Sequence, residues 1–207
     1  MVYPTGRMEI IQTSIVFLGD GFTPQLVRGK ALVTAFGAEP TNSIATPVLG
    51  NAEFASGLSL TVQPDRLDVR EKRPKSFTPQ LRDVAMKCLG FWPLVDPKAV
   101  GVNLVVGESF TDGFDRARAF DYVDQSRIES IIGTTVADQR HTFTFRAHGA
   151  RATIQLYEGP VPGKEAGLVL DLNAHYEPPV GIRAVLDSGP KWLERVQEWM
   201  VKIAADR

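Results

Sequence analysis

The spacing of hydrophobic and polar residues predicts β-strands along much of the chain, and the clearest series lies in the C-terminal half. Four successive segments there alternate in polarity or are rich in β-branched and aromatic residues. They are Arg127–Val136, His141–Ala147, Arg151–Tyr157 and Leu168–Tyr176. Because the connections between the first three segments are too short for crossover helices, we expect an antiparallel four-strand meander.

Further apolar segments predict strands in the N-terminal half. They are Ile10–Leu18, Leu58–Val62, Leu67–Arg70 and Val100–Val106. Gly37–Gly57 is expected to be a loop or irregular edge, in which only Thr46–Leu49 is apolar enough for a short strand. The four residues between Leu58–Val62 and Leu67–Arg70 carry Pro and Asp at positions that a type I turn favours. These two strands are therefore expected to form a hairpin.

The dipeptide Thr-Pro marks two helix starts, because Thr is a favourable N-cap and Pro fits the first helical turn. One helix is expected over Pro24–Phe36, ending at Gly37, since glycine readily adopts the left-handed conformation that ends helices. The second helix is expected to begin at Pro79 and to end before Gly90. A short helix with alternating Asp and Arg is expected over Phe114–Tyr122.

The segment that follows Pro190 predicts an amphipathic helix. Its charged residues lie on one side, and its apolar stripe comprises Trp192, Leu193, Val196, Trp199, Met200 and Ile203. Such a stripe needs an apolar surface to cover it, and the sheet is the expected partner. On this interpretation Trp199 is buried, and Trp199→Ala would cost about 3–5 kcal/mol.

Together these elements predict a single α+β domain over residues 1–207, built mainly on an antiparallel sheet, with two or three helices between strands. The pentapeptide Phe-Thr-Pro-Gln-Leu occurs at both Phe22–Leu26 and Phe77–Leu81. One explanation is a weak internal duplication, with units beginning near residues 10 and 58. The other explanation is that Thr-Pro is simply a good helix opening.

Composition excludes several classes of protein. Lys and Arg number 23 against 24 Asp and Glu, so no net field attracts nucleic acid or anionic lipid. No run of about 18 apolar residues predicts a membrane span, and the first residues do not resemble a signal peptide. The single Cys88 rules out an internal disulfide and a cysteine-based zinc site, which favours a cytoplasmic protein.

No motif for catalysis or cofactor binding is complete, and none points to a known family. Gly19-Asp20-Gly21 follows a strand as a dinucleotide-binding turn does, but Pro24 replaces its third glycine. Gly107–Thr111 lacks the closing glycine of a nucleophile elbow. Metal-binding spacings are absent among the three histidines, His141, His148 and His175. We therefore expect no cofactor and no bound metal, and we favour a protein that is not an enzyme.

One face of the C-terminal meander is predicted to be polar. If Ala147–Ala150 forms a hairpin loop, its strands pair Arg146 with Arg151, Thr144 with Thr153, and Thr142 with Gln155. The next strand alternates in the same way and would bring Asp171 and Asn173 near Thr153 and Arg151. The candidate binding site comprises Arg146, Arg151, Asp171, Asn173 and His175.

The chemistry of this candidate site favours an anionic ligand. Two arginines that face each other repel unless an anion lies between them, and that anion is either Asp171 or a carboxylate or phosphate of a partner. His175 would add a pH-sensitive donor. Arg151→Ala is then expected to weaken binding by about 1.5–3 kcal/mol without harming the fold. An ordinary solvated sheet face explains the same pattern.

The leading hypothesis is a binding or protein-interaction domain whose partner is an acidic protein or a small anionic ligand. One alternative is a hydrolase or transferase, with Asp171 and His175 as an acid/base pair and Ser109 as a remote nucleophile. Another is a structural subunit of a homo-oligomer, assembled through a strand edge or the Trp-bearing helix. Neither nucleic acid nor membrane is expected as a partner, and the sequence identifies no substrate and no biological process.

Overall fold

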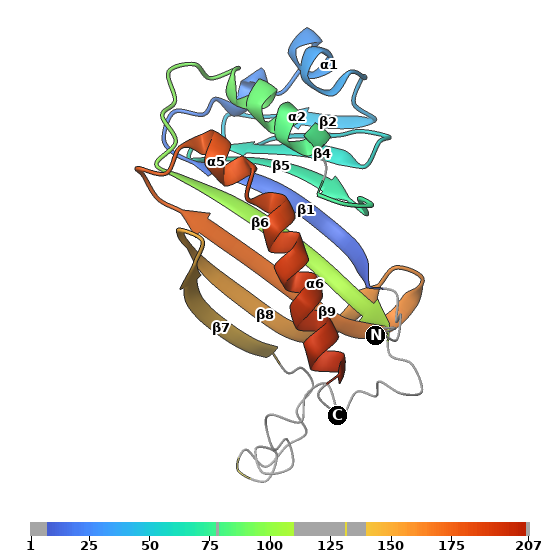
Figure 1. Cartoon of the computed structure of the whole chain (residues 1–207). Helices are drawn as coiled ribbons and strands as arrows, with labels where there is room; N and C mark the ends of the chain where they lie inside the picture. The colour runs from blue at the N-terminus through green and yellow to red at the C-terminus, as the bar shows by residue number, and fades with distance from the viewer. Residues whose placement is uncertain (1–7, 78, 110–130, 132–139, 206–207) are drawn as a thin grey trace.

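A nine-stranded antiparallel sheet forms the centre of the protein, as a computed structural model of the chain shows (Figure 1). The structure describes residues 8–77, 79–109, 131 and 140–205. The strand order is β2-β3-β4-β5-β1-β6-β9-β8-β7, and every neighbouring pair is antiparallel. The strands are β1 (Glu9–Leu18), β2 (Asn42–Ala45), β3 (Gly50–Glu53), β4 (Leu58–Gln63), β5 (Arg66–Lys72), β6 (Ala99–Ser109), β7 (Arg140–Ala147), β8 (Ala150–Val161) and β9 (Lys164–Tyr176).

The helices gather on one face of this sheet (Figure 1). They are the 3-10 helix η1 (Pro24–Leu26), α1 (Lys30–Phe36), α2 (Pro79–Leu89), α5 (Ile182–Leu186) and α6 (Gly189–Ala205). Helix α2 packs on β5 and β1, whereas α6 crosses β6 and β9. The predicted α+β class, with an antiparallel sheet and a C-terminal helix packed on it, is confirmed. None of the helices in the described residues is long and apolar enough to cross a membrane.

The expected strands and turns are confirmed in several places. The turn at Pro64 and Asp65 joins β4 to β5, and β7, β8 and β9 form a continuous antiparallel meander. The predicted helix Phe114–Tyr122 lies outside the described residues. The predicted strand Arg127–Val136 is described only at Ile131, where the chain is helical and not extended.

Two predictions in the N-terminal half are wrong in detail. The expected helix Pro24–Phe36 is interrupted, because Gly29 has a φ of 67° that no right-handed helix contains, and η1 and α1 lie on either side of the break. Gly37–Gly57, expected to be a loop or irregular edge, contains strands β2 and β3, and Thr46–Leu49 is the turn between them and not a short strand. The Thr46 side chain closes it by donating to the Leu49 carbonyl and accepting from the Leu49 amide, both at 3.0 Å.

Alternation along the central strands separates an apolar face from a polar one. On the helix side, Ile15, Phe17, Leu104, Leu170 and Leu172 are all at most 1% exposed. Helix α2 adds Cys88 to this core, where burial raises the pKa of the thiol to about 12, so it is not a reactive nucleophile. Because neighbouring side chains in a strand point to opposite faces, the same strands must present another set of residues on the far side.

Trp192 anchors α6 to the sheet through both packing and hydrogen bonds. Its indole Nε1 donates to Tyr176 Oη at 2.7 Å, and that hydroxyl donates to Ser188 Oγ at 2.8 Å. Its ring also lies 6.5 Å, centroid to centroid, from that of Phe145 on β7. Trp199, which the apolar stripe predicted to be buried, is only partly buried.

The chain passes through the sheet in two similar halves. Strand β1 is followed by β2 to β5, and β5 returns to pair with β1; likewise β6 is followed by β7 to β9, and β9 returns to pair with β6. The two central strands, β1 and β6, pair with each other. The pentapeptide Phe22–Leu26 follows β1, whereas Phe77–Leu81 follows β5. The two copies therefore occupy different points along this path.

Candidate functional site

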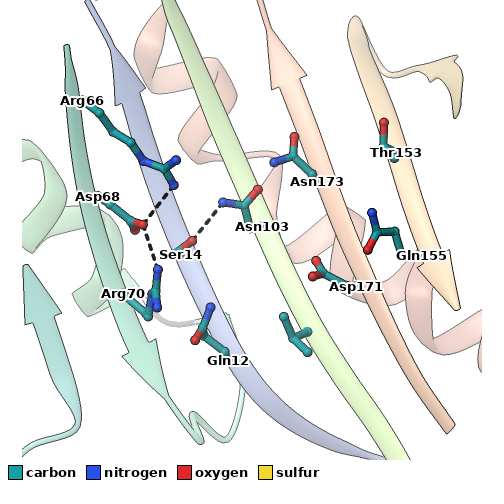
Figure 2. A pocket seen from close by; sticks show the side chains of 11 residues that line it. Gln12, Ser14, Arg66, Asp68, Arg70, Asn103, Thr153, Gln155, Asp171 and Asn173 are labelled. Atoms are coloured by element: carbon teal, nitrogen blue, oxygen red, sulfur yellow. Dashed lines mark hydrogen bonds and ion pairs between the residues drawn. The ribbon is translucent and has the colours of Figure 1, made fainter. Parts of the chain in front are cut away.

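A polar pocket of about 260 Å³ lies on the sheet face opposite the helices, where five strands contribute side chains (Figure 2). From β5 across to β8, its lining residues are Arg66, Asp68, Arg70, Gln12, Ser14, Asn103, Val105, Asp171, Asn173, Thr153 and Gln155. Only Val105 among them is hydrophobic. The pocket is therefore suited to a polar ligand.

Strand register places these side chains in rows that run across the sheet. Ser14 is paired with Arg70 on one side and with Asn103 on the other. Asn103 is paired with Asn173, which is paired with Thr153. Because directly opposed residues point to the same face, this register collects polar residues that are far apart in the sequence.

At one end of the pocket a buried carboxylate holds two arginines. Asp68 is 3% exposed, and its Oδ2 accepts from Arg66 Nη2 at 3.1 Å and from Arg70 Nη2 at 2.9 Å (Figure 2). The two arginine side chains are 42% and 37% exposed, so each keeps donors that face the solvent. Two guanidinium groups and one carboxylate leave this end with an excess positive charge.

The floor of the pocket contains acceptors that are not used within the described chain. Asn103 Nδ2 donates to Ser14 Oγ at 3.0 Å, and Ser14 is 1% exposed. Asn103 Oδ1 and Asp68 Oδ1 are both buried, and no donor in the described residues reaches either atom. Because an unpaired buried acceptor costs free energy, a water molecule or a ligand donor at these atoms would be stabilising.

Away from the two arginines, Asp171 on β9 adds a carboxyl group to the pocket. This residue is paired with Val105 on one side and Gln155 on the other. Burial raises the pKa of its carboxyl group, and the positive charge of Arg140 partly opposes that rise. Arg140 itself lies over the Tyr157 ring, 4.7 Å from the centroid. The pocket thus has two guanidinium groups at its β5 end and a carboxyl group on β9, with the uncharged Thr153 and Gln155 of β8 beyond it.

Asp171→Asn should increase the stability of the protein at neutral pH. The pKa of Asp171 is raised above its ordinary value of 3.8, so the folded protein favours the protonated form and ionisation opposes folding. Well below pH 3.8 the carboxyl group is neutral in both the folded and the unfolded states, and the variant gains no stability over wild type. Urea unfolding between pH 4 and pH 7.5 should show the advantage of the variant growing with pH. A stability difference between Asp171→Asn and wild type that does not change with pH would contradict the raised pKa of Asp171.

The register predicted for the hairpin of β7 and β8 is confirmed. Arg146 faces Arg151, and on the next strand His175 faces Arg151 while Asn173 faces Thr153. Asp171, however, faces Gln155. It is four residues from His175, the residue opposite Arg151, and four residues of a strand span about 14 Å. Asp171 therefore does not lie between the two arginines.

The structure brings only part of the predicted site into the pocket. Asp171 and Asn173 line it, whereas Arg146, Arg151 and His175 lie further along the same face and are not among its lining residues. The positive end is supplied instead by Arg66 and Arg70, which the sequence analysis did not select. The alternating pattern Arg-Leu-Asp-Val-Arg over 66–70 was the available signal, since it places three charged side chains on one face of a strand.

Residues of the enzyme alternative are spread along the sheet. Asp171 and His175 are four residues apart on β9, about 14 Å, so they do not share a hydrogen bond. Ser109 is at the far end of β6, opposite Gly167. Within the described residues, no three His, Cys, Asp or Glu side chains gather as a metal site would require.

No protein-family model matches the chain, and no curated protein matches its sequence significantly.

Proposed function

We propose that this is a non-enzymatic binding protein that holds a polar ligand with an anionic group in the pocket on the open face of its sheet. The anionic group would be bound by Arg66 and Arg70. The observation that carries the proposal is the buried Asp68, which orients both guanidinium groups toward the pocket through bonds of 3.1 and 2.9 Å.

Fixed orientation makes these arginines better anion ligands than free surface arginines. A flexible arginine loses side-chain entropy when it binds, and that loss is smaller if the guanidinium group is already held. Each guanidinium has five N–H donors, and Asp68 Oδ2 engages only one nitrogen of each. The remaining donors match the paired oxygens of a carboxylate or phosphate.

The rest of the pocket favours a ligand that can both donate and accept hydrogen bonds. Gln12, Asn103, Asn173 and Gln155 each carry a carboxamide, which offers a carbonyl acceptor and two N–H donors. A purely apolar ligand would leave these groups without partners. We further propose a cytoplasmic setting, because the single cysteine is buried in the core and forms no disulfide.

The same sheet face offers a second place where an anion could bind, outside the pocket. Arg146, Arg151 and His175 are consecutive in one row of the same face, so a carboxylate or phosphate there would meet up to three donors. This row differs from the pocket because, among the residues that the structure describes, no carboxylate pairs with Arg146 or Arg151 and orients it. Arg151→Gln, in this row, is therefore the matched control for Arg70→Gln, in the pocket.

Arg70→Gln should weaken anion binding by about 10- to 100-fold, the loss expected for charge-assisted hydrogen bonds. Calorimetric titrations with succinate, inorganic phosphate and uncharged glucose would measure it in wild type and in both Arg70→Gln and Arg151→Gln. We expect wild-type affinity for Arg151→Gln, because Arg151 lies outside the pocket. The glutamine keeps part of the packing, and Arg66 still pairs with Asp68, so both variants should fold.

Two results would contradict this assignment. If Arg151→Gln loses the anion and Arg70→Gln retains it, the binding site is the row at Arg146, Arg151 and His175. If wild type and both variants behave alike with every compound, the open face is an ordinary solvated surface.

A further inference from the structure

The pocket holds opposite charges on β5 and on β9, and hydrogen-bonding side chains lie between them. Figure 2 shows Arg66 and Arg70 on β5 at one side, Ser14 and Asn103 next to them, and then Asp171 on β9, with Gln155 of β8 beyond it. A simple anion would use only the positive end. The arrangement instead matches a ligand with a negative group at one end and a positive group at the other.

The groups between the two ends match peptide bonds. A side-chain carboxamide has the same donor and acceptor groups as a peptide bond, and Asn103 and Asn173 face each other in the centre of the pocket. Asn103 Oδ1 has no donor within the described residues, and a peptide N–H would supply one. Val105 is the single apolar lining residue, so the pocket offers little to distinguish one apolar side chain from another.

The width of the pocket limits the length of such a ligand. Strands β5 and β9 are separated by β1 and β6, so their backbones lie three strand spacings apart, about 14 Å. The long side chains of Arg66 and Arg70 occupy part of that width. Two or three extended residues span about 7–11 Å, which fits the remaining gap.

On these grounds, and resting on the anion-binding function proposed above, we propose that the ligand is a short zwitterionic peptide of two or three residues. Arg66 and Arg70 bind its terminal carboxylate, and Asp171 binds its terminal ammonium group. The carboxamides of Asn103 and Asn173 bond its peptide groups. Its side chains point out of the pocket into solvent, so binding depends on length and on free termini more than on side-chain identity.

Titration calorimetry with alanine peptides tests this proposal on the full chain. Dialanine or trialanine should bind at least about tenfold more tightly than alanine, N-acetyl-trialanine, trialanine amide or pentaalanine, because each of these lacks a charged terminus or has the wrong length. Asp171→Asn should weaken trialanine by about tenfold and leave N-acetyl-trialanine unchanged, since the acetylated peptide has no ammonium group. The asparagine is nearly isosteric, so the fold should be retained.

The outcomes separate this inference from the proposed function. If N-acetyl-trialanine binds as tightly as trialanine and binding still requires Arg70, the pocket holds an anion but does not recognise a peptide ammonium group, and the inference is wrong. If Asp171→Asn weakens both peptides equally, Asp171 does not read the ammonium group, which also overturns it. If no carboxylate compound binds wild type at all, the anion-binding function fails, and the inference fails with it.

Discussion

Trp192→Ala should lower the free energy of unfolding by about 3–5 kcal/mol, the cost expected for deleting a large buried aromatic side chain. Trp192 is 1% exposed and lies between α6 and the sheet. Its removal leaves a cavity and also deprives Tyr176 Oη of the indole donor at 2.7 Å. Because this is the one side-chain hydrogen bond between α6 and β9 in the part of the chain that the structure describes, we expect the helix to lose much of its anchorage.

Trp199→Ala provides the matched comparison on the same helix. Trp199 contacts the ring of Phe145 edge to face at 5.8 Å, but it is only partly buried. Its deletion should therefore cost about 1–2.5 kcal/mol, less than the 3–5 kcal/mol that the apolar stripe alone predicts. Urea unfolding of the two variants at one pH measures both values. Equal destabilisation, or a larger cost at Trp199, would contradict the packing described for α6.

Removing both arginines that bind Asp68 should destabilise the protein by about 3–5 kcal/mol, because a buried carboxylate would lose its partners. The physical reason is the difference in burial within the cluster. Asp68 is 3% exposed, and water cannot readily replace the guanidinium groups of Arg66 and Arg70. The double variant Arg66→Ala with Arg70→Ala therefore keeps a charge in a site that can no longer stabilise it.

Asp68→Ala should cost less, about 1.5–3 kcal/mol, although it breaks the same two contacts. The arginine side chains are 42% and 37% exposed, so water can hydrate them once the carboxylate is gone. Chemical unfolding at pH 7 would measure the free energy of unfolding of three proteins. They are the double variant, Asp68→Ala, and the triple variant that combines all three alanine substitutions. In the triple variant the cost should fall below that of the double variant, because the unpaired charge is absent. If Asp68→Ala destabilised the protein more than the double variant does, the unpaired carboxylate would not be the main source of destabilisation.

The same asymmetry makes the single variant Arg70→Gln better suited to binding measurements than the double variant. Arg70→Gln leaves Arg66 to pair with Asp68 at 3.1 Å, so binding can be weakened without exposing the protein to the full cost of an unpaired buried charge. The double variant would confuse loss of binding with loss of fold.

The local pattern of residues was enough to predict the α+β class, the β4–β5 hairpin and the register of β7 against β8. These strands are joined by short connections, so their pairing follows from alternation and from where each turn lies. The facing of Arg146 and Arg151 was predicted correctly for that reason. Gly29 shows a limit, since its φ of 67° interrupts a helix that composition alone would continue.

Only the tertiary structure decided which polar residues meet in the pocket. Ser14 and Asn103 are 89 positions apart in the chain, yet they are paired in neighbouring strands and share a hydrogen bond. The order β5-β1-β6-β9 cannot be derived from alternation, because each strand presents a polar face that would suit several neighbours. Sequence thus determined which side chains each strand offers to the open face. The long-range pairing of strands, chosen by burial of their shared apolar face, determined that Arg66, Arg70 and Asp171 border one site.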